Sequence, residues 1–73
     1  MKLRFTYHAR YRLDERGLAL IAEKIKQTIN TPDSRELLPK GKVKCKKVFG
    51  NKTLVVVYIK PRKEFLILSA YYL

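Results

Sequence analysis

Apolar residues between Leu18 and Asn30 recur at steps of three and four residues, the period of an amphipathic helix. The stripe they form consists of Leu18, Ile21, Ala22, Ile25 and Ile29. Thr31 and Pro32 follow, and proline disfavours helical geometry at the residue before it and donates no backbone hydrogen bond. The pattern therefore predicts a helix over 18–30 whose apolar stripe faces a core.

A second, only weakly amphipathic helix is predicted earlier in the chain, from about Tyr7 to Arg16. Thr6 precedes it as a candidate N-cap, and Gly17 follows it as a residue that tolerates the positive φ common at helix ends. Leu3 to Phe5 form a short candidate strand before this helix.

The rest of the chain is rich in residues that favour strands. The runs from Lys42 to Phe49 and from Lys52 to Lys60 are joined by Gly50 and Asn51, a pair that suits the tight turn of a hairpin. A third run, from Glu64 to about Tyr72, follows after three residues. These runs predict an antiparallel sheet.

A weaker extended segment, Arg35 to Leu38, adds a candidate edge strand. The expected fold is a single α+β domain over residues 1–73, with two N-terminal helices packed on one face of an antiparallel sheet of three to four strands.

Alternation along the first hairpin assigns its side chains to two faces. The first face takes Val43, Cys45, Phe49, Leu54, Val56 and Tyr58, and the second takes Lys44, Lys46, Val48, Thr53, Val55, Val57 and Ile59. Continued through the last strand, the same alternation sends Leu66, Leu68, Ala70 and Tyr72 to the first face, and Phe65, Ile67, Ser69 and Tyr71 to the second. Both faces are apolar and two helices cover only one, so the other is expected to be a ligand, partner or homodimer surface bordered by lysines.

Charge narrows the choice of partner. The chain carries 17 Lys and Arg against 6 Asp and Glu, a formal charge of +11, which favours encounter with polyanions. Nucleic acid is the leading partner class, with an anionic membrane surface or a purely solubilising role as alternatives. The single Cys45 excludes an internal disulfide and suits a reducing compartment, and no apolar run is long enough to span a membrane. We expect a soluble cytoplasmic protein.

A lysine-rich stretch opens the first hairpin and is a candidate nucleic-acid-binding element. Lys42, Lys44 and Lys46 alternate and so point the same way from a strand, while Lys47 extends the run. Tyr71 shares the lysine-bearing face in the predicted pairing and offers a ring that stacks on a base. The alternative is a solvated edge strand whose lysines discourage aggregation.

His8, Arg12 and Arg16 recur every four residues, on one side of the first predicted helix. Arginines bind phosphate through paired hydrogen bonds, and a neutral imidazole beside them is a candidate general base. The alternative is structural, with Arg10 pairing with Asp14 along the helix surface. One histidine without clustered carboxylates offers too few ligands for a metal, so neither a metal nor a cofactor is expected.

Several short motifs, taken in order, suggest a family. They are His8-Ala9-x-x-Arg12-x-x-x-Arg16-Gly17-Leu18, the break Asn30-Thr31-Pro32-Asp33, Val55-Val56-Val57-Tyr58 and the terminal Leu68-Ser69-Ala70-Tyr71. From Thr6 to Tyr72 the chain resembles a family of small bacterial and archaeal domains allied to the RelE/ParE toxin superfamily. Ser69 stands where many relatives have threonine and keeps the hydroxyl group.

The resemblance implies a RelE-like βααβββ fold and an RNA-directed toxin. The implied activity is metal-independent endoribonuclease cleavage of messenger RNA, including ribosome-bound RNA, with an antitoxin protein as partner. The residues matching the family's polar positions are His8, Arg12, Arg16 and Tyr71, which become the candidate catalytic residues. Strand geometry adds Ser69 to the lysines of the RNA-binding set. The alternative is a non-enzymatic module that binds nucleic acid or a protein.

Overall fold

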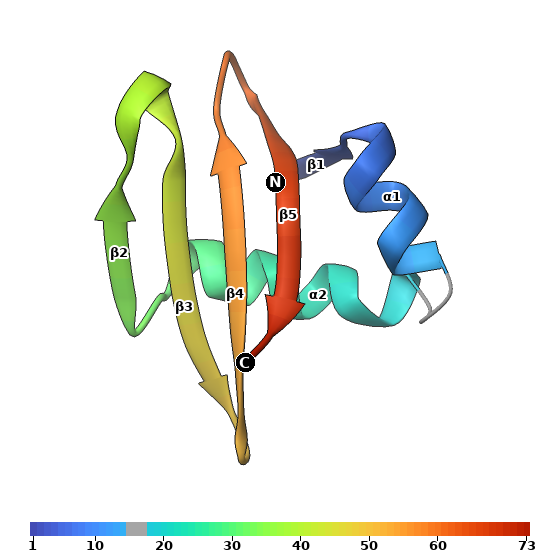
Figure 1. Ribbon diagram of the computed structural model, residues 1–73, viewed down its shortest axis with the longest axis vertical. Helices are drawn as coiled ribbons and strands as arrows, with labels where there is room; N and C mark the ends of the chain where they lie inside the picture. The colour runs from blue at the N-terminus through green and yellow to red at the C-terminus, as the bar shows by residue number, and fades with distance from the viewer. Residues whose placement is uncertain (15–17) are drawn as a thin grey trace.

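The computed structural model describes the fold of residues 1–14 and 18–73, and the side chains outside residues 11–20. Its elements, labelled in Figure 1, are β1 (Lys2–Phe5), α1 (Tyr7–Asp14), α2 (Leu18–Asn30), β2 (Ser34–Leu37), the short 3-10 helix η1 (Pro39–Gly41), β3 (Val43–Phe49), β4 (Lys52–Ile59) and β5 (Glu64–Tyr72). Within the described residues, no helix is both long and apolar enough to cross a membrane.

The sheet has five strands in the order β1-β5-β4-β3-β2 and is mixed, because β1 pairs with β5 in parallel while the other pairs are antiparallel. The expected antiparallel sheet of three to four strands in a RelE-like βααβββ arrangement is therefore wrong. The parallel pair joins distant parts of the chain, since Lys2 lies beside Glu64. No short turn connects the two strands, so no local sequence signal predicts their pairing. The weak segment before η1 is a full edge strand, which adds a fourth strand after the helices.

The start of α1 and the end of α2 follow their sequence signals, whereas the predicted end of the first helix at Arg16 and Gly17 lies outside the described residues. Thr6 caps α1, since its Oγ1 accepts a hydrogen bond from the Ala9 amide at 3.2 Å. Helix α2 covers the expected 18–30. A carbonyl in its last turn accepts a hydrogen bond from the sheet, because the Arg35 guanidinium of β2 donates to the Ile29 oxygen at 3.3 Å. The sheet thereby stabilises the C-terminal end of α2.

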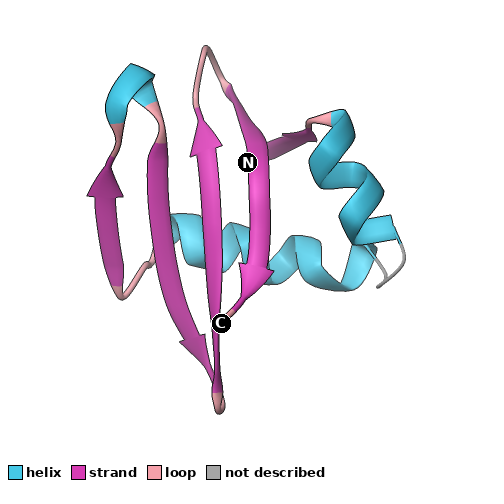
Figure 2. Cartoon of the chain, in the orientation of Figure 1, coloured by secondary structure: helices cyan, strands magenta, loops and turns pink. Residues whose placement is uncertain are grey.

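The core lies between α2 and the sheet, as Figure 2 shows by the helix behind the strands. Its buried side chains are Ile25 and Ile29 of α2 with Cys45, Leu54, Val56, Tyr58 and Ile67 of the strands. Helix α1 packs beside the β1–β5 end of the sheet through the buried Ala9. The hairpin assignments to the first face are confirmed by this core.

A register shift in β5 changes the assignments of the last strand. Val57 pairs with Ser69, but Tyr58 pairs with Ile67, so Leu68 is passed over. Such a bulge turns every residue before it to the opposite face. Phe65 and Ile67 consequently belong to the core, and the expectation that they share the lysine-bearing face is wrong; Leu66, assigned to the core, pairs with Ile59 on the other face.

Candidate nucleic-acid interface

The face of the sheet turned away from α2, called the open face below, is built from rows of three residues that cross β3, β4 and β5. From the C-terminal end of β5 these rows are Val48, Thr53 and Leu73; Lys46, Val55 and Tyr71; and Lys44, Val57 and Ser69. The first row ends beyond β5, where the Leu73 amide donates to the Thr53 oxygen at 2.9 Å. The predicted pairing of Lys44, Lys46, Ser69 and Tyr71 on one face is confirmed.

An apolar floor runs down the centre of the open face along β4. Val55 has no exposed surface although it points away from α2, because Lys46 and Tyr71 flank it on the neighbouring strands. The flanking positions are accessible: Tyr71 keeps 37% of its surface exposed and Val48 keeps 56%. An exposed ring beside an apolar floor is a surface on which a flat apolar group can lie.

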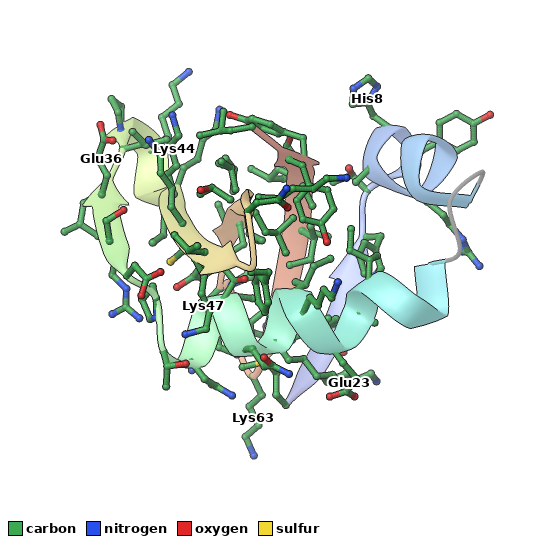
Figure 3. All side chains as sticks on the ribbon, turned by 90° about the horizontal axis from the view of Figure 1, so that it is seen from below. His8, Glu23, Glu36, Lys44, Lys47 and Lys63 are labelled. Atoms are coloured by element: carbon green, nitrogen blue, oxygen red, sulfur yellow. The ribbon has the colours of Figure 1, made fainter. Side chains whose placement is uncertain are left out.

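Lysines border this floor on the β3 side. Lys44 and Lys46 are half-buried, which is typical of lysines that lay their methylene stems along apolar surface and keep the ammonium in water. Lys42 lies just before β3 and is exposed. Figure 3 shows Lys44 on the upper side of the molecule, away from α2, and Glu36 on the neighbouring β2. The row of cations expected from alternation is therefore accessible.

Lys47, in contrast, lies on the helix side of the sheet. Its ammonium donates to the Thr31 carbonyl at 2.8 Å, at the end of α2, and Figure 3 shows it beside that helix. Its partner in β4 is the buried Leu54, opposite the open face. Of the four lysines in the candidate RNA-binding set, Lys47 thus has a structural contact and does not border the open face.

The basic ends of the strands gather at one end of the sheet. Antiparallel pairing brings η1, with Lys40, to the same end as the β4–β5 loop, which carries Lys60, Arg62 and Lys63 (Figure 1). Lys2 joins them, because β1 runs parallel to β5 from this end. Its contribution and that of Arg4 were missed from the sequence, since only the parallel pairing places β1 here.

The candidate catalytic residues come from different elements. His8 is exposed in the first turn of α1, and Figure 3 shows it on the upper side of the molecule, the side of the open face. Tyr71 lies on β5 within that face. The side chain of Arg12, and Arg16 altogether, fall outside the described residues. The structure brings Tyr71 together with Ser69 and the two lysines, and it places His8 on a separate element beside the sheet.

On the core side of the sheet, the Tyr58 phenol and the Cys45 thiol form a polar pair that sequence reasoning did not single out. Burial is the main factor that raises the pKa of Tyr58, and the neighbouring Cys45 thiol raises it further while Arg35 opposes the shift. The Tyr58 ring also meets Phe65 edge to face, with centroids 5.4 Å apart. This pair keeps a neutral phenol within the core, remote from the open face.

Comparison with protein-family models finds no match, and no curated protein or solved structure matches the chain at a significant level.

Proposed function

We propose that the protein binds single-stranded RNA on the open face. One observation carries the proposal: the row Lys46, Val55 and Tyr71 sets an ammonium and an exposed aromatic ring on either side of a buried apolar floor. Neighbouring strands are about 4.8 Å apart, so the two groups lie roughly 10 Å from each other across the sheet. This spacing supports simultaneous contact with a base and a phosphate.

Single strands suit this surface better than duplexes. Their unstacked bases are free to lie on an aromatic ring, and stacking tolerates any sequence because every base has a π-face. The lysines of β3 supply the charge that follows a phosphate backbone, and the excess charge of +11 raises the local concentration of polyanions. Ser69, one row from Tyr71, adds a hydroxyl that hydrogen-bonds to sugar or phosphate.

The test compares two double variants that remove the same charge from opposite sides of the molecule. Lys44→Ala/Lys46→Ala removes two positive charges from the open face. Lys24→Ala/Lys26→Ala removes two positive charges from α2. The affinity for a fluorescent single-stranded RNA is measured by anisotropy over a range of salt concentrations. Each lost phosphate contact lowers the log–log salt slope by about 0.7, so the open-face variant should lose about 1.4 and the α2 variant nothing. Equal losses in both variants contradict the proposal.

Cleavage of messenger RNA, in the manner of a toxin, is the second candidate. It is favoured by the exposure of His8 on the side of the molecule that carries the open face. Attack by a 2′-hydroxyl on the adjacent phosphate leaves a cyclic phosphate and releases a 5′-hydroxyl, and it needs a base such as the imidazole and cations that stabilise the charged phosphate. No metal or cofactor enters this step.

The two functions separate in one assay. The protein is incubated with RNA in the presence of a chelator, and the products are examined for cyclic phosphate ends. Cleavage that disappears in His8→Ala, with RNA affinity retained, supports the ribonuclease. Intact RNA that is nevertheless bound supports the binding module. Expression of the protein alone in bacteria extends the assay to ribosome-bound transcripts, since growth arrest with transcript loss is the outcome expected of a toxin that an antitoxin restrains.

A further inference from the structure

The open face continues beyond the bulge to a concave end. Leu66 pairs with Ile59 on one side and with Arg4 on the other, which puts the Arg4 side chain on this face. Here the surface is hollowed by a cavity of about 510 Å³, lined by Arg4, Pro61, Arg62, Lys63 and Glu64. The cavity thus lies between the first strand and the loop that joins β4 to β5.

Ion pairs orient the charged groups at this cavity. The Glu64 carboxylate accepts the Arg4 guanidinium and the Lys2 ammonium, each at 3.3 Å. Desolvation raises the pKa of Glu64, but the hydrogen bonds and positive charges of Lys2 and Arg4 outweigh it, so the pKa ends below its usual value. The carboxylate stays ionised at neutral pH and tethers the arginine at the rim of the cavity.

The charge balance of the lining favours an anion of more than one charge. Three cations, Arg4, Arg62 and Lys63, line the cavity with a single carboxylate, that of Glu64, which is already shared with Lys2 from outside the lining. Figure 3 shows Lys63 at its outer edge, on the side away from Lys44. A phosphodiester within a chain carries one negative charge, whereas a terminal phosphate carries about 1.5 to 2 at neutral pH. Guanidinium groups bind such phosphates through two parallel hydrogen bonds, and Pro61 restricts the backbone of the loop that presents them.

We propose that this cavity binds the terminal phosphate of an RNA strand that lies along the open face. The inference rests on the proposed function and adds a binding site for the end of the strand. The bases would lie near Tyr71, the backbone would follow Lys46 and Lys44, and the terminal phosphate would lie between Arg4 and the β4–β5 loop. Either a 5′-phosphate or a 3′-phosphate supplies this chemistry. The cavity would then select strands by their ends and set the direction in which they run.

The experiment uses three unlabelled RNAs of one sequence, with a 5′-phosphate, with a 3′-phosphate or with hydroxyls at both ends. Each competes with a fluorescent reference strand for the full-length protein. One of the two phosphorylated strands should compete at least about fivefold better than the hydroxyl strand. In Arg62→Ala/Lys63→Ala that preference should vanish, and in the control Lys24→Ala/Lys26→Ala it should persist.

A titration with inorganic phosphate, followed by NMR of the backbone amides, tests the cavity without RNA. The amides of Arg62, Lys63 and Glu64 should shift and saturate in the wild-type protein. Equal competition by all three RNAs, or a preference that survives in Arg62→Ala/Lys63→Ala, overturns the inference and leaves binding on the open face standing. If no RNA binds while these amides still shift, the proposed function and the terminal-phosphate inference both fail, and a simple anion site remains.

Discussion

Lys46 and Tyr71 lie in one row of the open face, two strands apart, with Val55 buried between them. The row combines the two contacts that single-stranded nucleic acid needs, charge for the backbone and a ring for a base. The neighbouring residues of the same strands point to the other face, where they form the core under α2. The alternation of β-strands thus separates the surface proposed to bind RNA from the side chains that hold the fold together.

Tyr71→Ala should weaken binding of single-stranded RNA by about 5- to 150-fold, because stacking of one base on an aromatic ring contributes about 1–3 kcal/mol. Tyr71→Phe keeps the ring and should bind nearly as well as the wild type. The matched control is Tyr7→Ala, which removes a tyrosine that is 86% exposed on α1. Fluorescence anisotropy measures all three; an equal loss in Tyr7→Ala would show that exposed tyrosines act nonspecifically.

Lys46 and Lys47 are neighbours in sequence with different expected roles. Lys46→Ala should lower the salt slope of RNA binding by about 0.7, the value of one phosphate contact, with little change in stability. Lys47→Ala should leave the slope unchanged and reduce the free energy of unfolding by about 1 kcal/mol, since it removes the hydrogen bond to the Thr31 carbonyl at the end of α2. Anisotropy and urea denaturation of each variant provide the comparison. A reversed pattern would contradict the assignment of the two lysines to opposite faces.

Deletion of Leu68 tests the bulge in β5. Without this residue, the pairs Val57–Ser69 and Tyr58–Ile67 follow one another in regular alternation, so Phe65 and Ile67 stay in the core. The deletion variant should therefore keep its cooperative thermal transition. Ile67→Ala, which removes a large apolar side chain from the core, should instead cost about 2–5 kcal/mol. Circular dichroism on heating compares the two variants, and loss of the cooperative transition in the deletion variant would contradict the assignment of Leu68 as the extra residue.

Tyr58 should make the protein sensitive to alkali. Burial raises its pKa in the folded state above 10.0, the ordinary value for tyrosine, so its contribution to stability is complete below that value. As the pH rises through 10 and then through the folded pKa, the unfolded chain loses its proton first and the contribution declines. Between about pH 9 and 11, wild type should lose more unfolding free energy than Tyr58→Phe, which has no phenol to titrate. Parallel urea titrations at the two pH values measure this; equal losses would rule out Tyr58 as the source.

Local signals in the sequence predicted local structure well. The three- and four-residue steps gave α2 its bounds, Thr6 marked the start of α1, and Gly50, with a φ of 64°, occupies the hairpin turn that it predicted. These features depend on residues close together in the chain. Their success extends to the face shared by Lys46 and Tyr71, since alternation needs only the register of one hairpin and the last residues of β5.

Features that depend on distant residues were missed. The parallel pairing of β1 with β5 joins residues 62 positions apart, such as Lys2 and Glu64, and no turn announces it. The bulge at Leu68 was not predictable from the sequence either, because its apolar neighbours fit either face of the sheet. For this reason the sequence did not indicate Arg4, the residue that lines the cavity together with the β4–β5 loop.

Chemical-shift mapping tests the central claim most directly. A short single-stranded RNA is titrated into the labelled protein, and the backbone amide signals are followed by NMR. The largest shifts are predicted at Lys44, Lys46, Ser69 and Tyr71 on the open face, with the exposed α2 residues Glu23 and Gln27 unchanged. Shifts that centre on α2, or an unchanged spectrum at RNA concentrations well above that of the protein, would contradict the account.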